Sequence, residues 1–199
     1  MARLLVATGN PGKLAEFEEL LDGLSLELQG WSTEVDEVGE TYEANAALKS
    51  EAAAAAGGLP ALGDDSGLEV DALGGSPGLL SARLAPTPEE RIQTLLSRLA
   101  GAPRPWRARF VCVVTLSVPG QRTRAFLGER WGEIVEPRVT GRGFGYDPVF
   151  WVPEVGLTFA EMAPEEKHRW SHRGAAVKAL VESGALSRLG DASPADPRP

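Results

Sequence analysis

The order of apolar and polar positions along the chain is typical of an α/β protein. A continuous apolar run over residues 3–8 predicts a buried parallel strand, and helical spacing over residues 11–22 predicts an amphipathic helix. The apolar positions of this helix are Leu14, Phe17, Leu20 and Leu21. Because a glycine-containing turn joins the two segments, we expect strand, turn and helix to open the domain.

The middle of the chain continues this alternation. The expected elements are a strand at 25–30, an acidic loop at 31–40, an alanine-rich helix at 41–56, an acidic turn at 64–67 and a short strand at 68–72. Ile92, Leu95, Leu96 and Leu99 then follow i, i+3, i+4, i+7 spacing, which predicts a helix that begins near Pro88.

The second half of the chain predicts an antiparallel element. Residues 109–118 and 123–135 have the composition of strands and are joined by a short turn, so we expect a long hairpin. A brief strand at 149–152 follows. The fold class predicted is therefore α/β, with a mixed twisted sheet flanked by helices.

A last helix is expected at residues 171–188, with Val177, Leu180 and Val181 on its buried face. No internal repeat or break in composition marks a linker, so residues 1–190 are expected to form one domain. Residues 191–199 are polar and rich in proline, and we expect them to form a disordered tail.

Composition and charge narrow the range of partners. The 199 residues carry a formal net charge of −8, which argues against binding to nucleic acid or to an anionic membrane, because either needs a basic face. The single cysteine, Cys112, lies in an apolar run and is expected in the core. No signal-peptide pattern and no apolar stretch of membrane-spanning length is visible. We therefore expect a cytoplasmic protein with a small phosphate-bearing partner.

The first candidate motif is TGNPGK at residues 8–13, between the first strand and the first helix. Its backbone N–H groups, hydroxyl, amide and lysine would all face one anion at a helix N-terminus. It is not a Walker A loop, because only two residues separate Gly9 from Gly12. Lys13 stands where the helix macrodipole disfavours a cation unless an anion is bound. The alternative is a plain glycine turn before a helix.

A second motif, DDSG at residues 64–67, places two carboxylates side by side with no basic residue next to them in the sequence. A bound cation would relieve their repulsion, and Mg²⁺ bridges protein oxygens to phosphate oxygens. Together, the first two motifs predict Mg²⁺-assisted phosphate chemistry. The alternative is that Asp64 and Asp65 only cap a turn.

A third motif, FGYDP at residues 144–148, carries aromatic side chains on a glycine loop. Exposed aromatic faces of this kind suit stacking on a nucleobase, and the alternative is a packed turn.

The fourth motif, SHRG at residues 171–174, opens the last helix. Serine is a preferred N-cap residue, so Ser171 is expected to cap this helix. His172 and Arg173 add donors at the positive end of the helix. Lys167 adds a cation nearby, although together with the acidic pair at 165–166 it would also form a solvated charge cluster.

In this order, the four motifs resemble those of the inosine triphosphate pyrophosphatase family, also called Ham1-like. The resemblance spans about residues 3–185 and includes LGGSPG at 73–78 and SAR at 81–83. Members are homodimeric mixed α/β enzymes that hydrolyse ITP, dITP and XTP to the monophosphate and pyrophosphate with Mg²⁺, which cleanses the nucleotide pool. The resemblance therefore implies a Mg²⁺-dependent homodimer that acts on a small nucleoside triphosphate.

The resemblance also implies roles for individual residues. Asp65 matches the family's proton-acceptor aspartate and metal ligand, and Glu37 falls where the family places a metal-binding glutamate. Ala44 precedes Asn45 where the family usually has a glutamate, and Glu43 lies one position earlier. The residues implied to bind substrate are Thr8, Gly9, Asn10, Pro11, Gly12, Lys13, Ser66, Phe144, Gly145, Tyr146, Asp147, Lys167, His172 and Arg173.

In the expected reaction, water attacks the α-phosphorus, and Mg²⁺ and Lys13 neutralise the leaving pyrophosphate. Asp65 can be both metal ligand and base only if its two oxygens divide these roles, and Asp64 is the other candidate base. Donors from His172 and Arg173 would match the 6-oxo edge of hypoxanthine and mismatch adenine. Two other interpretations stay open, namely a Maf-like nucleotide pyrophosphatase of different base specificity and a nucleotide sensor without turnover.

Overall fold

The computed structural model describes residues 1–32, 35–138 and 143–189. Its strands are β1 (Ala2–Ala7), β2 (Leu26–Trp31), β3 (Ala61–Val70), β4 (Pro77–Gly78), β5 (Trp106–Ser117), β6 (Arg124–Ile134), β7 (Phe150–Val152) and β8 (Leu157–Thr158). Its α-helices are α1 (Pro11–Leu20), α2 (Tyr42–Gly57), α3 (Pro88–Leu99), α4 (Pro164–Trp170) and α5 (His172–Glu182).

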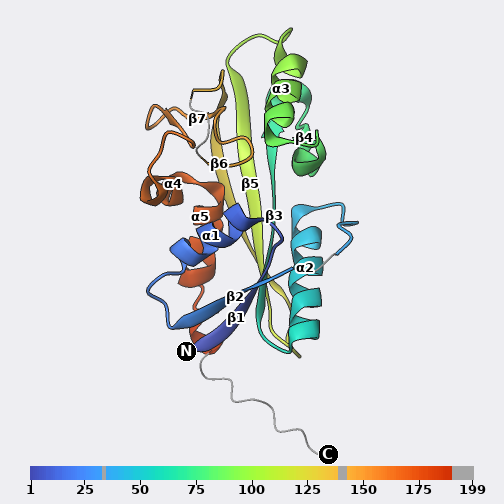
Figure 1. The fold of residues 1–199 in the computed structure, drawn as a ribbon, viewed down its shortest axis with the longest axis vertical. Coiled ribbons are helices and arrows are strands. Elements are labelled where there is room, and N and C mark those ends of the chain that lie inside the picture. Colours follow the sequence, from blue (N-terminus) through green and yellow to red (C-terminus); the bar gives the residue numbers. More distant parts are fainter. Residues whose placement is uncertain (33–34, 139–142, 190–199) are drawn as a thin grey trace, which may run out of the picture. The chain divides into compact units, whose positions relative to one another are not determined.

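These strands form one mixed eight-stranded sheet (Figure 1). The strand order is β2-β1-β3-β5-β6-β7-β8, and β4 pairs with β3 beside this path. Strand β1 runs parallel to both β2 and β3, whereas β4 is antiparallel to β3 and β7 is antiparallel to β6 and β8. The predicted α/β class is confirmed, including the long antiparallel hairpin of β5 and β6.

The chain divides into two compact units. The first comprises Met1–Asp64, Val114–Phe126 and Ala176–Pro199, and the second comprises Asp65–Val113 and Leu127–Ala175. Strands β3, β5 and β6 each contribute residues to both units. In β3 the division falls between Asp64 and Asp65, so these two aspartates are joined by a peptide bond but belong to different units.

In the first unit, α2 packs closely on β1 and β3 (Figure 1). Leu5 and Ala61 from the strands and Ala53 and Ala54 from the helix form a buried apolar cluster. At Gly63 the approach is so close that a Cβ atom would meet the Ala46 carbonyl oxygen. Small side chains on both elements therefore hold α2 directly against the strand that leads into the aspartates.

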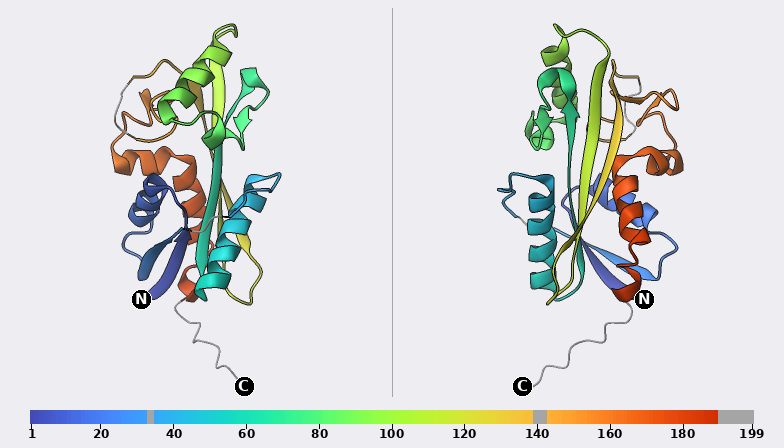
Figure 2. Two further views of the ribbon diagram at one scale, coloured as in Figure 1. Left: turned by 45° about the vertical axis from the view of Figure 1, so that its right-hand side comes forward. Right: turned by 180° about the vertical axis from the view of Figure 1, so that it is seen from behind.

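In the second unit, the core is larger and more aromatic. Phe110, Phe150 and Phe159 are in mutual contact, with ring centroids 4.7 Å apart for Phe110 and Phe150 and 4.9 Å apart for Phe150 and Phe159. Helix α3 begins with a capping box formed by Thr87 and Glu90, which supplies partners for its first backbone N–H groups. Its predicted apolar positions Ile92, Leu95 and Leu99 are buried in this core. Figure 2 shows α3, in green, beside the upper part of β5.

Two predicted features of the sheet and the last helix are wrong. The expected turn at 64–67 and separate strand at 68–72 are one continuous ten-residue strand, β3. Polar residue types predicted a turn, but pairing partners along the sheet keep this segment extended. The last helix ends at Glu182 rather than residue 188, and Val181, predicted to be buried, is 38% exposed.

The remaining expectations have mixed outcomes. Cys112 is fully buried, as predicted. Within residues 1–32, 35–138 and 143–189, every helix is too short or too polar to cross a lipid bilayer. Residues 33–34 of the predicted acidic loop and the predicted tail at 191–199 lie outside the described residues.

Candidate functional site

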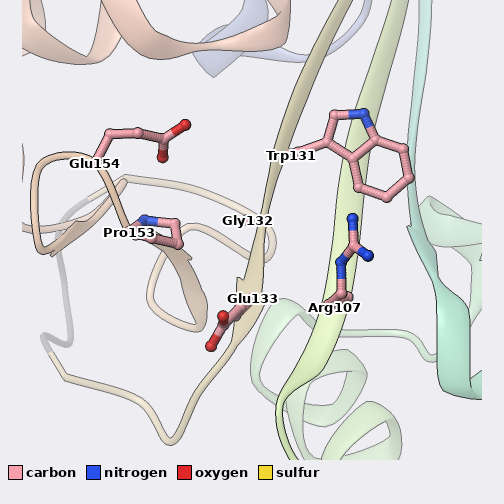
Figure 3. A pocket seen from close by; sticks show the side chains of 6 residues that line it. All are labelled: Arg107, Trp131, Gly132, Glu133, Pro153 and Glu154. Atoms are coloured by element: carbon pink, nitrogen blue, oxygen red, sulfur yellow. The ribbon is translucent and has the colours of Figure 1, made fainter.

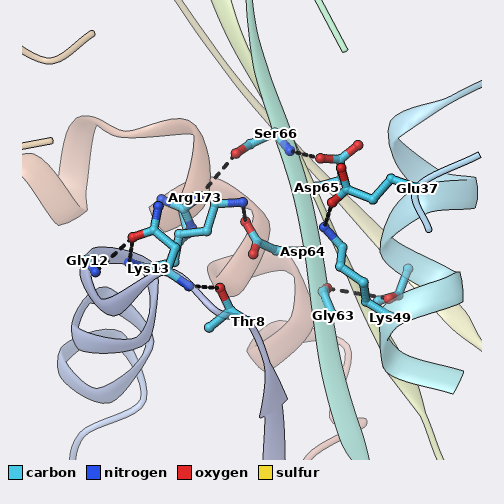
Figure 4. A network of polar contacts seen from close by, with 12 residues as sticks. Thr8, Gly12, Lys13, Glu37, Lys49, Gly63, Asp64, Asp65, Ser66 and Arg173 are labelled. Carbon is cyan, nitrogen blue, oxygen red and sulfur yellow. Dashed lines mark hydrogen bonds and ion pairs between the residues drawn. The ribbon is translucent and has the colours of Figure 1, made fainter. Parts of the chain in front are cut away.

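The TGNPGK segment forms the turn into α1 and satisfies its own helix terminus. Asn10 is the N-cap, and its Oδ1 accepts hydrogen bonds from the backbone N–H groups of Gly12 (2.9 Å) and Lys13 (3.3 Å). Thr8 Oγ1 accepts from the Asn10 N–H at 3.1 Å (Figure 4). In the folded chain, two of the N–H groups predicted to face an anion therefore donate to Asn10.

The lysine of this segment pairs with the first aspartate of DDSG. Lys13 Nζ lies 3.0 Å from Asp64 Oδ2, and the two side chains are 16% and 1% exposed (Figure 4). The expectation of an acidic pair without a basic neighbour is therefore wrong for Asp64. Sequence adjacency could not show this contact, because the cation comes from α1 and the carboxylate from β3.

The two aspartates lie within a strand, and this separates them. Successive side chains of a strand point to opposite faces of the sheet, so Asp64 and Asp65 do not present their carboxylates to the same side. Asp65 is 8% exposed, and its Oδ1 accepts the Ser66 N–H at 3.0 Å. Asp64 and Asp65 were expected as adjacent carboxylates of an exposed turn, but both are buried and their surroundings differ.

Helix α2 holds the segment that contains Glu37. Lys49 Nζ lies 2.8 Å from Glu37 Oε1 (Figure 4), and Asn45 Oδ1 accepts the Gly39 N–H at 2.8 Å. Neither Lys49 nor Asn45 was predicted as a site residue from the residues themselves. A signal was available for Lys49, because it is the only basic residue in the alanine-rich sequence of α2.

In the second unit, Arg173 joins three of the predicted motifs. Its side chain is almost fully buried, at 1% residue exposure, and its Nη2 donates to Ser66 Oγ at 3.3 Å. Its guanidinium carbon lies 5.9 Å from the centroid of the Phe144 ring. The SHRG segment is thus next to both DDSG and FGYDP.

A buried ion pair lies beneath the FGYDP loop. Lys167 Nζ lies 2.7 Å from Asp147 Oδ2, which also accepts the Phe144 N–H at 2.8 Å. The same ammonium lies 4.5 Å from the Phe144 ring centroid. Lys167 is therefore a buried partner of the loop and not part of a solvated charge cluster.

The second aromatic residue of the loop anchors it to the core. Tyr146 is 4% exposed, and its hydroxyl donates to the Ser81 carbonyl oxygen at 2.9 Å. Burial raises the pKa of Tyr146 to about 12, although the positive charges of Arg91 and Arg98 act in the opposite direction. The expectation that both aromatics expose their faces is wrong for Tyr146, whereas Phe144 is partly exposed.

The imidazole of His172 lies flat against the aromatic core. Its ring stacks on Phe110 at a centroid distance of 4.4 Å and an interplanar angle of 7°, with Phe159 at 6.2 Å. This packing fixes the ring plane at the start of α5. Among the other predicted contacts, Gly9 is exposed in the turn before α1, and Pro11 is the exposed first residue of α1. Gly145 is a turn position with a φ of 59°.

Among the residues that the structure describes, no group of three or more His, Cys, Asp or Glu side chains forms a metal cluster. Mg²⁺ needs no such cluster when one or two carboxylates and substrate phosphates bind it. The buried aspartates and Glu37 offer the oxygen donors that Mg²⁺ prefers, so the donor chemistry fits this ion.

A separate hollow of about 200 Å³ lies on the second unit (Figure 3). It is lined by Arg107, Trp131, Gly132, Glu133, Pro153 and Glu154. None of these residues belongs to the four motifs, so the hollow is not part of the predicted site.

Comparison with known proteins identifies the family. A model of the Ham1 family matches residues 4–183. A dITP/XTP pyrophosphatase of Symbiobacterium thermophilum is 49% identical over 186 residues, which cover 90% of this chain and 93% of the relative. A dITP/XTP pyrophosphatase of Thermus thermophilus is 50% identical over 191 residues, which cover 91% of each chain. The solved structure of a HAM1 protein from Coxiella burnetii matches with a TM-score of 0.81 at 39% identity, covering 93% of this chain and all of that one. The chain therefore belongs to the Ham1 family.

Proposed function

We propose that this chain is a dITP/XTP pyrophosphatase that hydrolyses dITP, XTP and ITP to the monophosphate and pyrophosphate. One structural observation carries the proposal beyond family membership. The DDSG stretch contacts the phosphate-binding motif through Asp64 and Lys13, and it contacts the SHRG motif through Ser66 and Arg173. Within the first unit, Asp64 thus contacts the group proposed for phosphate, and within the second unit Ser66 contacts the group proposed for the base.

The residues of the first unit would bind the triphosphate. Lys13 supplies a point charge at the N-terminus of α1, where the helix dipole also favours an anion. In the free protein this ammonium is held by Asp64, so Lys13 is already positioned before a phosphate arrives. Positioning of this kind lowers the entropy that must be lost on binding.

Glu37 and Asp65 would hold Mg²⁺ in this proposal. When bound, the metal neutralises charge on the substrate phosphates and on the leaving pyrophosphate. Asp65 is the base that we favour, because Lys13 already binds Asp64 through Oδ2. The Ser66 N–H holds Asp65 Oδ1, which orients the carboxylate that would take the proton of the attacking water.

The residues of the second unit would read the base. Phe144 offers a partly exposed ring for stacking, and its backbone is fixed by Asp147. Arg173 lies beside that ring and carries donors that suit the O6 and N7 acceptors of a 6-oxo purine. The fixed ring of His172 is the second candidate donor. The proposal extends to a homodimer, as the family resemblance implies, and to a cytoplasmic protein with residues 1–190 as one domain, as the sequence pattern predicts.

The test is pyrophosphate release by the purified chain with Mg²⁺, compared across dITP, XTP, ITP, GTP, ATP and dTTP. We expect the three non-canonical purine nucleotides to be hydrolysed fastest. Turnover of dTTP above that of dITP would instead support the Maf-like specificity. Tight binding of dITP without any pyrophosphate would support a sensor. Sedimentation of the same sample tests the dimer.

A further inference from the structure

Four buried or partly buried hydroxyl groups form a continuous chain in the first unit. Ser50 Oγ of α2 lies 2.8 Å from Thr115 Oγ1 and 2.7 Å from Ser117 Oγ, both on β5. Ser117 Oγ lies 3.0 Å from Thr123 Oγ1, and Thr123 donates to Glu51 Oε1 at 2.6 Å. The chain thus begins in the core between α2 and β5 and ends at an exposed carboxylate of α2.

The outer end of this chain favours one direction for its hydrogen bonds. An ionised carboxylate only accepts, so Thr123 is the donor to Glu51. Each hydroxyl has one hydrogen, so Ser117 donates to Thr123. The hydrogen of Ser50 has two acceptors within reach, Ser117 Oγ at 2.7 Å and the Ala47 carbonyl oxygen at 3.2 Å. The hydrogen of Thr115 likewise has Ser50 Oγ at 2.8 Å and the Gly63 carbonyl oxygen at 3.4 Å. The shorter contact of each favours a chain of donors that runs from Thr115 through Ser50 and Ser117 to Thr123 and the Glu51 carboxylate.

This chain draws α2 closer to the sheet than apolar contacts permit. Oxygen pairs at 2.7–2.8 Å are shorter than the roughly 3.5–4.0 Å of carbon contacts. Next to them, Gly63 has no room for a Cβ atom beside α2, and Thr115 Oγ1 lies 3.4 Å from its carbonyl oxygen. Hydroxyl pairing with β5 and the missing side chain at Gly63 of β3 together set the distance between α2 and the sheet.

That distance matters for the candidate site. Lys49, which holds Glu37, precedes Ser50 in α2, and Asn45, which holds Gly39, lies on the same helix. On the strand side, Gly63 directly precedes Asp64. A shift of α2 away from β5 would therefore move the groups that hold Glu37 while the strand stays in place.

We propose that Ser50 and Thr115 are positioning residues of the pyrophosphatase site, and that their hydroxyl pair sets the placement of α2 that aims Glu37. This inference rests on the proposed function. In the proposed function neither residue contacts the substrate, because both side chains are fully buried. Their effect passes through Lys49 and Asn45 to the segment that contains Glu37.

The matched variants are Thr115→Val and Thr115→Ser. Valine has the shape of threonine but puts a methyl group against Ser50 Oγ, whereas serine keeps the hydroxyl. We expect Thr115→Val to lower kcat for dITP roughly 10- to 100-fold, with KM within about twofold, since small misplacement of catalytic groups acts on turnover. Thr115→Ser should retain kcat within about threefold. Thr158→Val is the control, because Thr158 is a buried threonine of the second unit whose hydroxyl donates to Glu161.

A second measurement does not depend on activity. Amide hydrogen exchange of the free protein should become about tenfold faster at Gly39 in Thr115→Val than in Thr115→Ser, with amides of the second unit unchanged. Ser50→Ala gives the same test if Thr115→Val does not fold. The proposal would be overturned if the valine and serine variants had equal exchange rates at Gly39 and equal kcat. It would also be overturned if the loss of kcat in Thr115→Val disappeared after correction for the fraction of folded protein. If the unmodified chain releases no pyrophosphate, the proposed function fails, while the exchange comparison still decides whether the hydroxyl pair holds Glu37's segment.

Discussion

Replacing Lys13 with alanine tests whether the helix terminus or the buried ion pair governs this position. For the helix alone, Lys13→Ala should stabilise the free protein, because it removes a cation from the N-terminal turn and introduces the best helix former. The structure predicts the opposite sign. Lys13 Nζ lies 3.0 Å from Asp64 Oδ2, and the Asp64 side chain is only 1% exposed.

The magnitude follows from these two opposing effects. Removing one partner of a buried ion pair costs about 3–5 kcal/mol, and we take the lower end because the Lys13 side chain is 16% exposed and water can enter its place. Helix propensity and dipole relief return about 1 kcal/mol. The net loss of unfolding free energy is about 2 kcal/mol, which lowers Tm by about 4–8 °C in a chain of this size.

The assay is urea unfolding of four proteins: the unmodified chain, Lys13→Ala, Asp64→Asn and the double variant. Asp64→Asn removes the charge that Lys13 compensates, so the double variant should lose less stability than the two single variants combined. We expect a coupling energy of about 2 kcal/mol. Pyrophosphate release should fall in Lys13→Ala as well. A higher Tm for Lys13→Ala, or no coupling to Asp64→Asn, would refute the structural reasoning.

Three further predictions concern the second unit. Asp65→Asn should keep the fold and reduce turnover about a hundredfold or more, and near-normal pyrophosphate release from the folded variant would contradict the assignment. Arg173→Ala should shrink the ratio of kcat/KM for ITP over ATP about 5- to 150-fold, because ATP lacks the 6-oxo acceptor; an unchanged ratio with equal losses would place the guanidinium on phosphate. Since burial raises the pKa of Tyr146 from 10.0 to about 12, the fold favours the neutral phenol, and this stabilisation is complete below pH 10 and lost as pH rises towards 12. Tyr146→Phe should remove that alkaline loss in urea unfolding measured from pH 9 upwards, and identical pH profiles would argue against it.

The spacing of apolar residues was enough to predict most of the fold, because this spacing reflects which side chains are buried. The positions Ile92, Leu95 and Leu99 are buried in α3 as their spacing predicts. Apolar spacing does not predict the structure where polar residues are buried. The DDSG stretch has the composition of a turn, yet it is the centre of β3, since partners from other elements compensate its side chains.

The candidate site shows the same division. The four motifs supplied its candidate residues, and the structure shows Asp64 of DDSG in contact with Lys13 and Ser66 in contact with Arg173. The sequence did not show which of these side chains contact one another. Lys49 and Asn45 bind the segment around Glu37, and Tyr146 is an anchor in the core. These pairings depend on contacts between distant segments, which local patterns do not encode.

The cap at Asn10 has a consequence for ligand choice. Its side-chain oxygen already accepts the N–H groups of Gly12 and Lys13, so any anion that takes these donors must first break two hydrogen bonds, each worth about 1 kcal/mol. That cost is the same for every anion, whereas in the proposed site the free energy gained on binding would grow with the number of phosphoryl groups that reach Lys13. A single orthophosphate would recover little of the cost, and a triphosphate chain would recover more. The Asn10 cap would therefore act as an internal competitor that favours nucleoside triphosphates over small phosphates.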